Sequence, residues 1–426
     1  MIDIKRLREQ PEFFQKKWAE RGLSVDVSRL LKFDADYRAT LCRAEELQAQ
    51  RKKASEEIGK IKKAGGDASA AQEQVRKSGD EITALNAESE SSLKLLNDEL
   101  LRLPNPCSDS TPVGSDEHGN KEVRTWGTKP ELSFAPKAHW DLGKELNILD
   151  LERGVKLSGS GFELLRGAGA QLERALINFF LDKASEHGYT EHWVPFMVNE
   201  KTMTGTGQLP KFADDLYKVT DDFWLIPTAE VPLTNIYADE ILDKDQLPLQ
   251  LAAFTPCFRR EAGAAGKDTR GILRVHQFSK IELVKIVEPS QSYTELELLV
   301  ADAEHLLQQL GLHYRVLELC TGDIGFGAAK CYDIEAWAPG VGRFLEVSSC
   351  SNFEDFQARR LQLRFRAEKG AKPQLCHTLN GSGLALPRIM IAILETYQRE
   401  DGGIDIPDAL VPYMGGRREI PPVAKK

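Results

Sequence analysis

Residues 251–261 read LAAFTPCFRRE and residues 273–282 read LRVHQFSKIE, and these two stretches decide the fold. Both have the apolar composition of β-strands, and the segment between them is rich in glycine. Strands joined by a short loop pair antiparallel, because a parallel pair needs a long crossover connection. The sequence therefore predicts an antiparallel hairpin within an α+β core.

The same hairpin gathers three kinds of side chain that suit a nucleotide lying beside an amino acid. The guanidinium of Arg259 can hold a phosphate through paired hydrogen bonds, and the ring of Phe278 can stack on a base. The carboxylate of Glu282 can pair with an ammonium group, and it lies on a buried-looking strand where it needs a partner. The loop with Lys267 and Arg270 is predicted to form a mobile basic rim.

Predicted elements after residue 135 lack the regular alternation of a parallel sheet. The predicted helices cover residues 170–187, 229–242, 290–310 and 383–397. The predicted strands cover residues 192–198, 223–227, 251–260, 273–286, 313–320, 330–336 and 342–349.

The N-terminal quarter differs in kind. Apolar residues recur at spacings of three and four from Leu30 to Ile61 and again from Val75 to Leu103, with the turn sequence AGGD at 64–67 between them. This pattern predicts an antiparallel coiled-coil arm of roughly 45–50 Å. Its distal half is basic, which suits either a solvated surface or contact with a polyanion. The basic residues are Lys52, Lys53, Lys60, Lys62 and Lys63.

Composition changes again at residues 103–135, which are rich in Pro, Ser, Thr, Gly, Asp and Asn. The sequence therefore predicts an arm domain over residues 1–102, a connector over 103–135 and an α+β core over 136–426. The 426 residues are 41% hydrophobic and 28% charged, which is typical of a soluble globular protein. A net charge of −9 argues against general nucleic-acid binding. Seven cysteines without a CxxC pair, no membrane span and no secretory signal favour the cytoplasm.

Several phosphate-binding and metal-binding patterns are absent. The loop around Gly266 and Lys267 lacks the first glycine and the Ser or Thr of a P-loop. Gly159-Ser160-Gly161 lacks the third glycine of a dinucleotide fold. No Cys/His set has zinc spacing, so no zinc is expected.

Three segments resemble the motifs of class II aminoacyl-tRNA synthetases. Residues 188–196 resemble motif 1, the hairpin resembles motif 2, and GSGLALPR at 381–388 resembles motif 3. TAE at 228–230, EVSS at 346–349, NGSG at 380–383 and the helical arm are together similar to bacterial-type seryl-tRNA synthetases. The resemblance covers essentially the whole chain. Two departures are Pro387, where the family often has glycine, and Arg260, where it often has a smaller residue.

The resemblance implies that the chain is a serine–tRNA ligase with an antiparallel class II catalytic sheet flanked by helices. It would form seryl-adenylate from serine and ATP, with Mg²⁺, and charge tRNA(Ser), with tRNA(Sec) as a further candidate. The implied catalytic residues are Arg259, Arg388 and Glu346. The implied ATP-binding set is Arg259, Arg260, Glu261, Val275, Phe278, Glu346, Val347, Ser348, Ser349 and Arg388, with Glu346 and Ser349 as Mg²⁺ ligands.

The same resemblance implies a serine pocket, a tRNA surface and a homodimer formed through motif 1. The serine-binding set is Thr228, Ala229, Glu230, Glu282, Asn380 and Ser382. The tRNA-binding set is Lys52, Lys53, Lys60, Lys62, Lys63, Lys267 and Arg270.

Two other functions compete with this one. A paralogue could deliver activated serine to a carrier protein, although it would not need the arm. A non-enzymatic coiled-coil protein on an inactive synthetase domain would have lost residues such as Arg259, Glu282, Glu346 or Arg388, and all four are present.

Overall fold

The computed structural model describes residues 1–262 and 269–423. Apart from Met1, the chain divides into two compact units, one of residues 2–103 and one of residues 104–426. Residues 263–268, and with them the predicted tRNA contact Lys267 and most of the predicted basic rim, lie outside the described residues.

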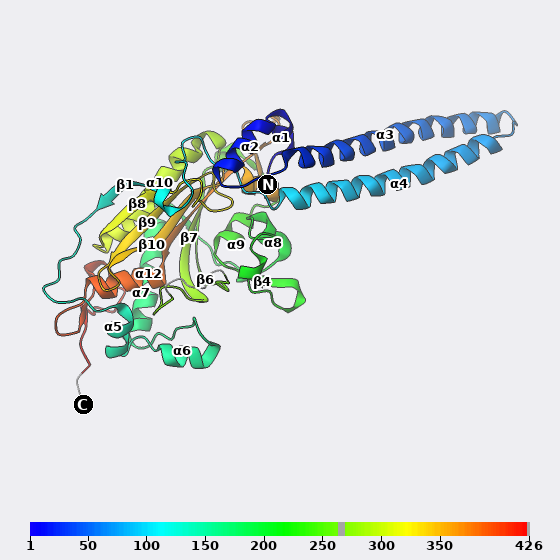
Figure 1. Ribbon diagram of the computed structural model, residues 1–426. Helices are drawn as coiled ribbons and strands as arrows, with labels where there is room; N and C mark the ends of the chain where they lie inside the picture. Colours follow the sequence, from blue (N-terminus) through cyan, green and yellow to red (C-terminus); the bar gives the residue numbers. More distant parts are fainter. Residues whose placement is uncertain (263–268, 424–426) are drawn as a thin grey trace. The chain divides into compact units, whose positions relative to one another are not determined.

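The N-terminal unit contains a long helical hairpin (Figure 1). The side chain of Asp26 caps the first long helix by accepting a hydrogen bond from the Arg29 N–H, and Gly65 turns the chain with a φ of 76°. The predicted arm is confirmed. The helices of this unit are α1 (Ile4–Glu9), α2 (Pro11–Glu20), α3 (Val27–Lys63) and α4 (Ser69–Leu100).

One apolar seam holds the two long helices together. Leu30, Ala44 and Leu47 of α3 are buried, as are Ile82 and Leu96 of α4. Two helices can bury only a single stripe against each other, so every other face is left to solvent. In α3 none of the residues after Leu47 is buried, and the distal half of this helix therefore presents mainly polar surface.

The second unit is built around a largely antiparallel sheet with the strand order β1-β8-β9-β10-β13-β7-β6-β2. The predicted hairpin is β6 and β7, paired from Leu249 with Ile286 to Phe258 with Gln277. The strands are β1 (Lys121–Trp126), β2 (Thr190–Glu191), β6 (Leu249–Phe258), β7 (Gln277–Val287), β8 (Tyr314–Glu318), β9 (Lys330–Ala338), β10 (Arg343–Asn352) and β13 (His377–Ala385). The predicted α+β class is confirmed.

Alternation along β7 separates the two faces of the sheet. Ile281 and Leu283 join the main core cluster beneath α7, α10 and α12. Lys280 and Glu282 point to the other face and line a cavity, and Val284 continues that face into a smaller apolar cluster. The helices of this unit are α5 (His139–Glu145), α6 (Leu151–Ser158), α7 (Ala168–Glu186), α8 (Glu200–Gly205), α9 (Glu230–Asn235), α10 (Ser292–Gln309), α11 (Phe356–Leu361) and α12 (Leu386–Thr396).

Short paired strands lie outside the main sheet. They are β3 (Met197–Asn199), β4 (Phe223–Leu225), β5 (Ile241–Asp243), β11 (Arg364–Arg366), β12 (Gln374–Leu375), β14 (Ile404–Asp405) and β15 (Glu419–Ile420).

None of the helices in the described ranges is long and apolar enough to cross a membrane.

Three predicted elements are wrong in extent. The strand predicted over 273–286 begins only at Gln277, since the N–H of His276 donates to the Gly161 carbonyl instead of to β6. The strand predicted over 192–198 is broken, because Pro195 has no N–H to donate to a ladder and pairing is confined to β2 and β3. The helix predicted over 229–242 ends at Asn235, whose amide donates to the Val231 carbonyl, and residues 241–243 form β5 instead.

Several strands are absent from the sequence-based prediction, among them β1, which lies in the segment predicted to be a connector, and β13. Residues 377–382 were not assigned to any element and 383–385 were assigned to a helix, whereas the structure has β13 there. Glycine is unfavourable in strands, so sequence alone disfavours this assignment. The reason lies in packing: a Cβ on Gly381 would come within 2.9 Å of the Cys350 sulfur, so only glycine fits where β13 passes β10 and α10.

Candidate active site

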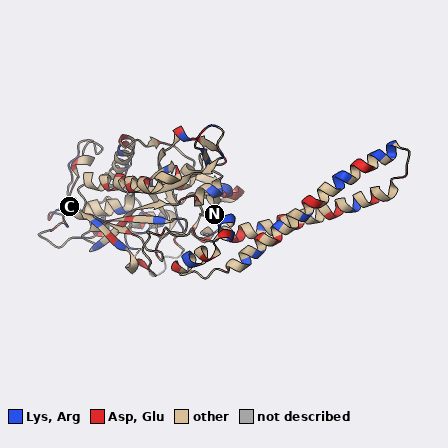
Figure 2. Ribbon diagram, turned by 90° about the horizontal axis from the view of Figure 1, so that it is seen from above, with Lys and Arg blue, Asp and Glu red and all other residues tan. Residues whose placement is uncertain are grey.

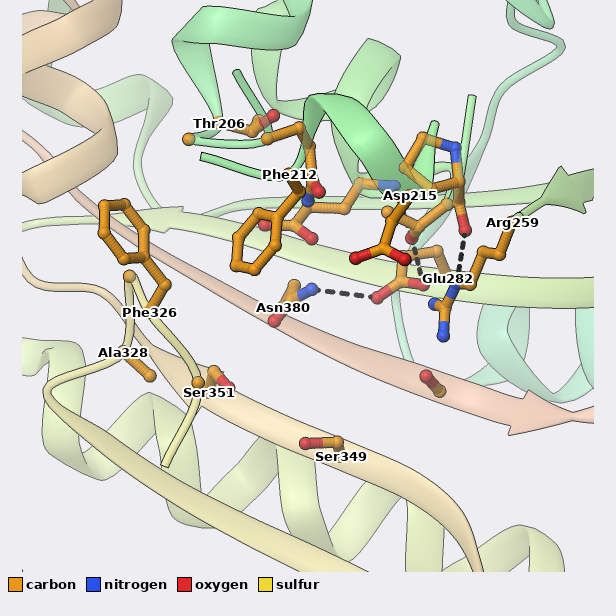
Figure 3. A pocket seen from close by; sticks show the side chains of 18 of the residues that line it. Thr206, Phe212, Asp215, Arg259, Glu282, Phe326, Ala328, Ser349, Ser351 and Asn380 are labelled. Atoms are coloured by element: carbon orange, nitrogen blue, oxygen red, sulfur yellow. Dashed lines mark hydrogen bonds between the residues drawn. The ribbon is translucent and has the colours of Figure 1, made fainter. Parts of the chain in front are cut away.

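The cavity on the open face of the sheet is about 570 Å³ and is lined by residues from three central strands, β7, β10 and β13, from α9 and from the loops around them (Figure 3). A second cavity of about 180 Å³ adjoins it. Six residues line both and so mark their junction: Arg259, Glu261, Arg274, Lys280, Glu346 and Ser382.

Glu282 is the centre of the larger cavity. Its side chain is 1% exposed. Thr228 Oγ1 donates to Glu282 Oε2 at 2.9 Å, and Asn380 Nδ2 donates to Oε1 at 3.1 Å. Lys280 Nζ forms an ion pair with Oε2. The sequence analysis predicted that this buried carboxylate needs a partner. One of its partners is Lys280, which lies two residues away on the same face of the strand.

Glu230 is the second buried carboxylate of this cavity. Gln357 Nε2 donates to Glu230 Oε1 at 2.6 Å, and Thr378 Oγ1 donates to Gln357 Oε1 at 2.7 Å, which fixes the amide. Burial, together with the negative charge of Glu282, raises the pKa of Glu230 to about 7. Glu230 can therefore change its charge near neutral pH.

Of the remaining residues predicted to bind serine, one lines the cavity and one does not. Ser382 lines the cavity and stands opposite Glu282 in the pairing of β13 with β7. Ala229 is fully buried in the smaller apolar cluster with Leu233 and does not line the cavity.

Arg259 lies at the junction of the two cavities. Its Nε donates to the Pro227 carbonyl at 3.3 Å, and its guanidinium lies 5.1 Å from the centre of the Phe278 ring. A cation held over an aromatic ring keeps its charge available to a ligand, because the ring supplies no competing acceptor. The site therefore has a fixed positive group between a carboxylate-lined pocket and an aromatic wall.

The smaller cavity is lined by most of the residues that were predicted to bind ATP. Arg274 NH1 donates to Glu261 Oε2 at 2.5 Å. Arg388 NH1 donates to the Glu346 carbonyl at 2.8 Å and lies 3.3 Å from Oε2 of the same residue. The predicted ATP residues that line this cavity are Arg259, Glu261, Val275, Phe278, Glu346, Val347 and Arg388.

Two predicted ATP residues do not reach either cavity. Arg260 is exposed, and its N–H donates to the Asp215 carbonyl at 2.8 Å. Ser348 is buried, and its Oγ donates to the Ser382 carbonyl at 2.6 Å, which ties β10 to β13. A register shift in β10 between Glu346 and Ser348 produces this difference, because it turns Ser349 rather than Ser348 towards the larger cavity.

Glu346 and Ser349 are the predicted metal ligands. Both line the larger cavity. Asp333 pairs with Ser349 across β9 and β10, and burial with the charge of Glu346 raises the pKa of Asp333 well above its ordinary value. The oxygen donors of Glu346 and Ser349 are of the kind that a hard cation prefers. Within residues 1–262 and 269–423, no group of three or more His, Cys, Asp or Glu side chains is arranged to hold a metal.

The predicted tRNA residues of the arm lie on α3, and all five lysines are exposed. Basic residues gather near the end of this helix (Figure 2). Arg270 belongs to the other unit, and its guanidinium lies 4.4 Å from the Trp140 ring centre.

Sequence reasoning missed several residues of the site. Lys280 follows from strand alternation, since it shares a face with Glu282, but its pairing was not anticipated. Gln357 had no local signal, because it lies 127 positions from Glu230. An edge-to-face pair of rings, Phe212 and Phe326, with centres 5.9 Å apart, closes one side of the larger cavity (Figure 3).

Comparisons with known proteins match both units. Residues 1–107 match the family described as the seryl-tRNA synthetase N-terminal domain. Residues 212–397 match the family described as the tRNA synthetase class II core domain (G, H, P, S and T). The serine–tRNA ligase of Geobacter sulfurreducens is 53% identical over 429 residues, covering 99% of this chain and 100% of that protein. That of Nitratidesulfovibrio vulgaris (strain Miyazaki F) is 52% identical over 422 residues, covering 99% of each.

Solved structures agree. The crystal structure of seryl-tRNA synthetase from Pyrococcus horikoshii complexed with ATP superposes with a TM-score of 0.93 at 42% identity, covering 100% of both chains. The crystal structure of the cytoplasmic serine–tRNA ligase from Naegleria fowleri with AMP gives a TM-score of 0.87 at 30% identity, covering 100% of this chain and 99% of that one.

Proposed function

The chain belongs to the seryl-tRNA synthetase family of class II aminoacyl-tRNA synthetases, and on this premise we propose that it joins serine to tRNA(Ser) at the expense of ATP. The products are seryl-tRNA(Ser), AMP and diphosphate. One observation at the site carries the proposal. The larger cavity contains Glu282, the smaller one contains Phe278, and Arg259 lies where the two cavities join.

Serine would be recognised in the larger cavity. Its ammonium and hydroxyl are the groups that need buried acceptors, and Glu282, Glu230 and Ser382 offer them. Alanine would leave those acceptors unpaired, and a site built to bind a hydroxyl rejects the analogue that lacks it by about 10⁴-fold. Asn380 and Thr228 support this role because they hold the Glu282 carboxylate in one orientation.

Adenylate formation follows from the charge distribution. A carboxylate oxygen of serine attacks the α-phosphorus as the bond to diphosphate breaks, and negative charge gathers on the phosphate oxygens. The attacking group is already ionised, so no general base is needed. Arg259 would stabilise this charge from the junction of the cavities, and fixed donors of this kind contribute more than in water because the site is pre-organised.

ATP would lie in the smaller cavity. Phe278 would stack on one face of the adenine and Arg388 would cover the other face while meeting the γ-phosphate. The contact between Arg388 and Glu346 supports this, because both groups line the cavity at the end where phosphates would enter. Glu261 and Val275 would meet the base edge.

Glu346 and Ser349 would hold Mg²⁺, with phosphate oxygens as the remaining ligands. Their oxygen donors fit a hard cation. When bound, the ion would neutralise charge on the phosphates. Arg388, which already contacts Glu346, would keep that carboxylate directed into the cavity.

The domain boundaries remain part of the proposal. Residues 1–102 would bind tRNA through the basic end of the arm, residues 103–135 would connect, and residues 136–426 would carry catalysis. Five exposed lysines on α3 support an electrostatic, shape-based contact with the RNA backbone. A selenocysteine tRNA of similar shape is a second candidate acceptor.

A homodimer through motif 1 and a cytoplasmic location complete the proposal. Trp193 is 81% exposed, Met197 54% and Phe223 43%, and β3 and β4 bring the last two onto one small sheet. Large apolar side chains left open to water in this way support an interface with a second copy of the chain.

The test is serine-dependent exchange of pyrophosphate into ATP, followed by charging of tRNA(Ser). Exchange and charging together are expected. Absence of serine-dependent exchange would overturn the proposed activity, and exchange without charging would favour transfer to a carrier protein instead.

A further inference from the structure

Lys280 occupies the place where the substrate's own ammonium is expected. Its side chain is 6% exposed and lies inside the larger cavity. Its Nζ pairs with Glu282 Oε2, donates to Thr228 Oγ1 at 2.9 Å and lies 3.4 Å from Ser382 Oγ. Each of these three partners belongs to the proposed serine pocket.

The hydrogen bonds around Glu282 leave little capacity for another cation. Oε1 accepts from Asn380, and Oε2 accepts from both Thr228 and Lys280. An incoming ammonium that binds Glu282 would need an oxygen of the same carboxylate. Two ammonium groups on one carboxylate repel each other strongly in a site shielded from water. The amino-acid ammonium and Lys280 therefore compete for Glu282.

Lys280 also lies at the junction of the two cavities. In the proposed reaction, that junction is where the carboxylate of the amino acid meets the α-phosphate of ATP. A lysine side chain is long and has rotatable carbons, so its charge can be redirected over a few ångströms without movement of β7.

We propose that Lys280 is a catalytic residue that exchanges partners: it holds Glu282 in the free protein, yields that carboxylate to the ammonium of serine, and then contacts the reacting carboxylate and α-phosphate. This inference rests on the proposed function. In the step itself, a serine carboxylate oxygen forms a bond to the α-phosphorus and the bond from that phosphorus to the bridging oxygen of diphosphate breaks. Lys280 keeps its proton throughout and, with Arg259, offsets the charge that develops.

A purely structural role is the competing explanation, since a buried ion pair can simply hold a fold together. The same strand provides a comparison. Lys285 Nζ donates to Glu295 Oε2 at 2.9 Å and its side chain is 2% exposed, yet it lines neither of the two cavities. Loss of Lys285 therefore reports the structural effect of removing a buried ammonium from β7.

The first experiment compares Lys280→Met with Lys285→Met and wild type in the full-length protein. We measure the dissociation constant for L-serine without ATP, the kcat of pyrophosphate exchange at saturating substrates, and the melting temperature. For Lys280→Met we expect kcat to fall about 10²- to 10³-fold, as for loss of one transition-state donor. Serine affinity should be unchanged or tighter, because the competing ammonium is gone.

If Lys280 exchanges partners, its loss should lower kcat without weakening the affinity for serine, and this combination distinguishes the proposal from a purely structural role. If Lys280→Met weakens serine binding in proportion to its loss of kcat, or keeps wild-type kcat, the inference is overturned. Lys285→Met should lower the melting temperature without separating the two parameters. Wild type that lacks serine-dependent exchange would defeat the proposed function itself, which keeps the two failures distinguishable.

Removal of Lys280 leaves Glu282 buried without its cation, and the variant can fail to fold for that reason. A crystal structure of the wild-type chain with L-serine and a non-hydrolysable ATP analogue tests the proposal without any substitution. We expect the serine ammonium on Glu282 and Lys280 Nζ within hydrogen-bonding distance of the serine carboxylate or the α-phosphate. Lys280 still paired with Glu282 in that complex would refute the exchange.

Discussion

At Glu282 a carboxylate is kept almost entirely out of water, and three donors from three separate segments converge on it. Such a group is costly to bury unless its oxygens are satisfied. The protein satisfies them with its own side chains, so the pocket is formed before any ligand arrives. The same donors make the site selective, because each must regain a partner when the substrate binds.

Arg259→Ala should remove the charge that stabilises the proposed transition state. We expect the kcat of pyrophosphate exchange to fall about 10²- to 10³-fold or more, as when a pre-organised donor is lost. Its link to the Pro227 carbonyl is long, at 3.3 Å, so the melting temperature should change little. Arg260→Ala is the neighbouring control, since that side chain lies outside both cavities and should cost much less. Exchange near the wild-type rate in Arg259→Ala would contradict the role.

Glu230 should make serine use depend on pH. Its pKa is raised to about 7 by burial and by Glu282, so the carboxylate form is lost as the pH falls through that value. We expect kcat/KM for serine to rise between pH 6 and 8 and the step to disappear in Glu230→Gln.

Gln357→Leu provides the matched control for this titration. The hydrogen bond from Gln357 favours the charged form of Glu230 and so lowers its pKa against the two effects that raise it. Its removal should move the midpoint of the pH profile upward. A profile whose midpoint is the same in wild type and Gln357→Leu would assign the step to another group.

At the scale of elements, β13 and α3 show two ways in which a segment serves function. β13 tolerates Gly381 because α10 and β10 pack directly on its backbone, and this close approach aligns Asn380 and Ser382 with β7. In α3 the opposite holds. Its distal half buries almost nothing, so its sequence is free to present charge.

Replacement of the five arm lysines by glutamine should weaken tRNA charging and spare adenylation. Lys52, Lys53, Lys60, Lys62 and Lys63 have no carboxylate partner in the described part of the chain, so their charge is available to phosphates. A plot of log kcat/KM for tRNA against log salt concentration has a negative slope, and we expect the magnitude of this slope to decrease by up to about 5.

The control for the arm is Lys94→Gln on α4, where the ammonium already pairs with Asp98 at 2.6 Å. It should charge tRNA normally. Deletion of residues 32–100 should likewise leave serine-dependent exchange largely intact while abolishing charging. Loss of both activities in the deletion would mean that the arm is needed for folding.

At the scale of the whole molecule, the exposed apolar residues near motif 1 predict association. Trp193→Glu or Met197→Glu would place a charge in the proposed interface, and sedimentation equilibrium should show at least about a 100-fold weaker dimer, as for loss of an interface anchor. Leu95→Glu is the control, since Leu95 is 51% exposed on α4, in the unit of residues 2–103. A dimer of unchanged affinity in both Trp193→Glu and Met197→Glu would exclude this surface.

Local pattern determined two features of this protein from its sequence, the α3–α4 hairpin and the β6–β7 pair, whereas the predicted residues of the two cavities came from the resemblance to a known family. These features follow from periodicity and from turns, which act over a few residues. Prediction failed where a distant contact overrules local preference, as in the glycine-containing strand β13 and the shortened helix α9.

Only the tertiary structure decided which polar groups meet. Thr228 and Asn380 reach Glu282 from 54 and 98 positions away, and no spacing in the sequence announces either contact. It also turned Ser349 and not Ser348 into the cavity, through a register shift in β10. Side-chain chemistry is a property of residues, and the sequence determines it. The partner of a buried charge depends on the packed sheet. Lys280 and Glu282 lie on the same face of β7, both out of water, and there each charge compensates the other.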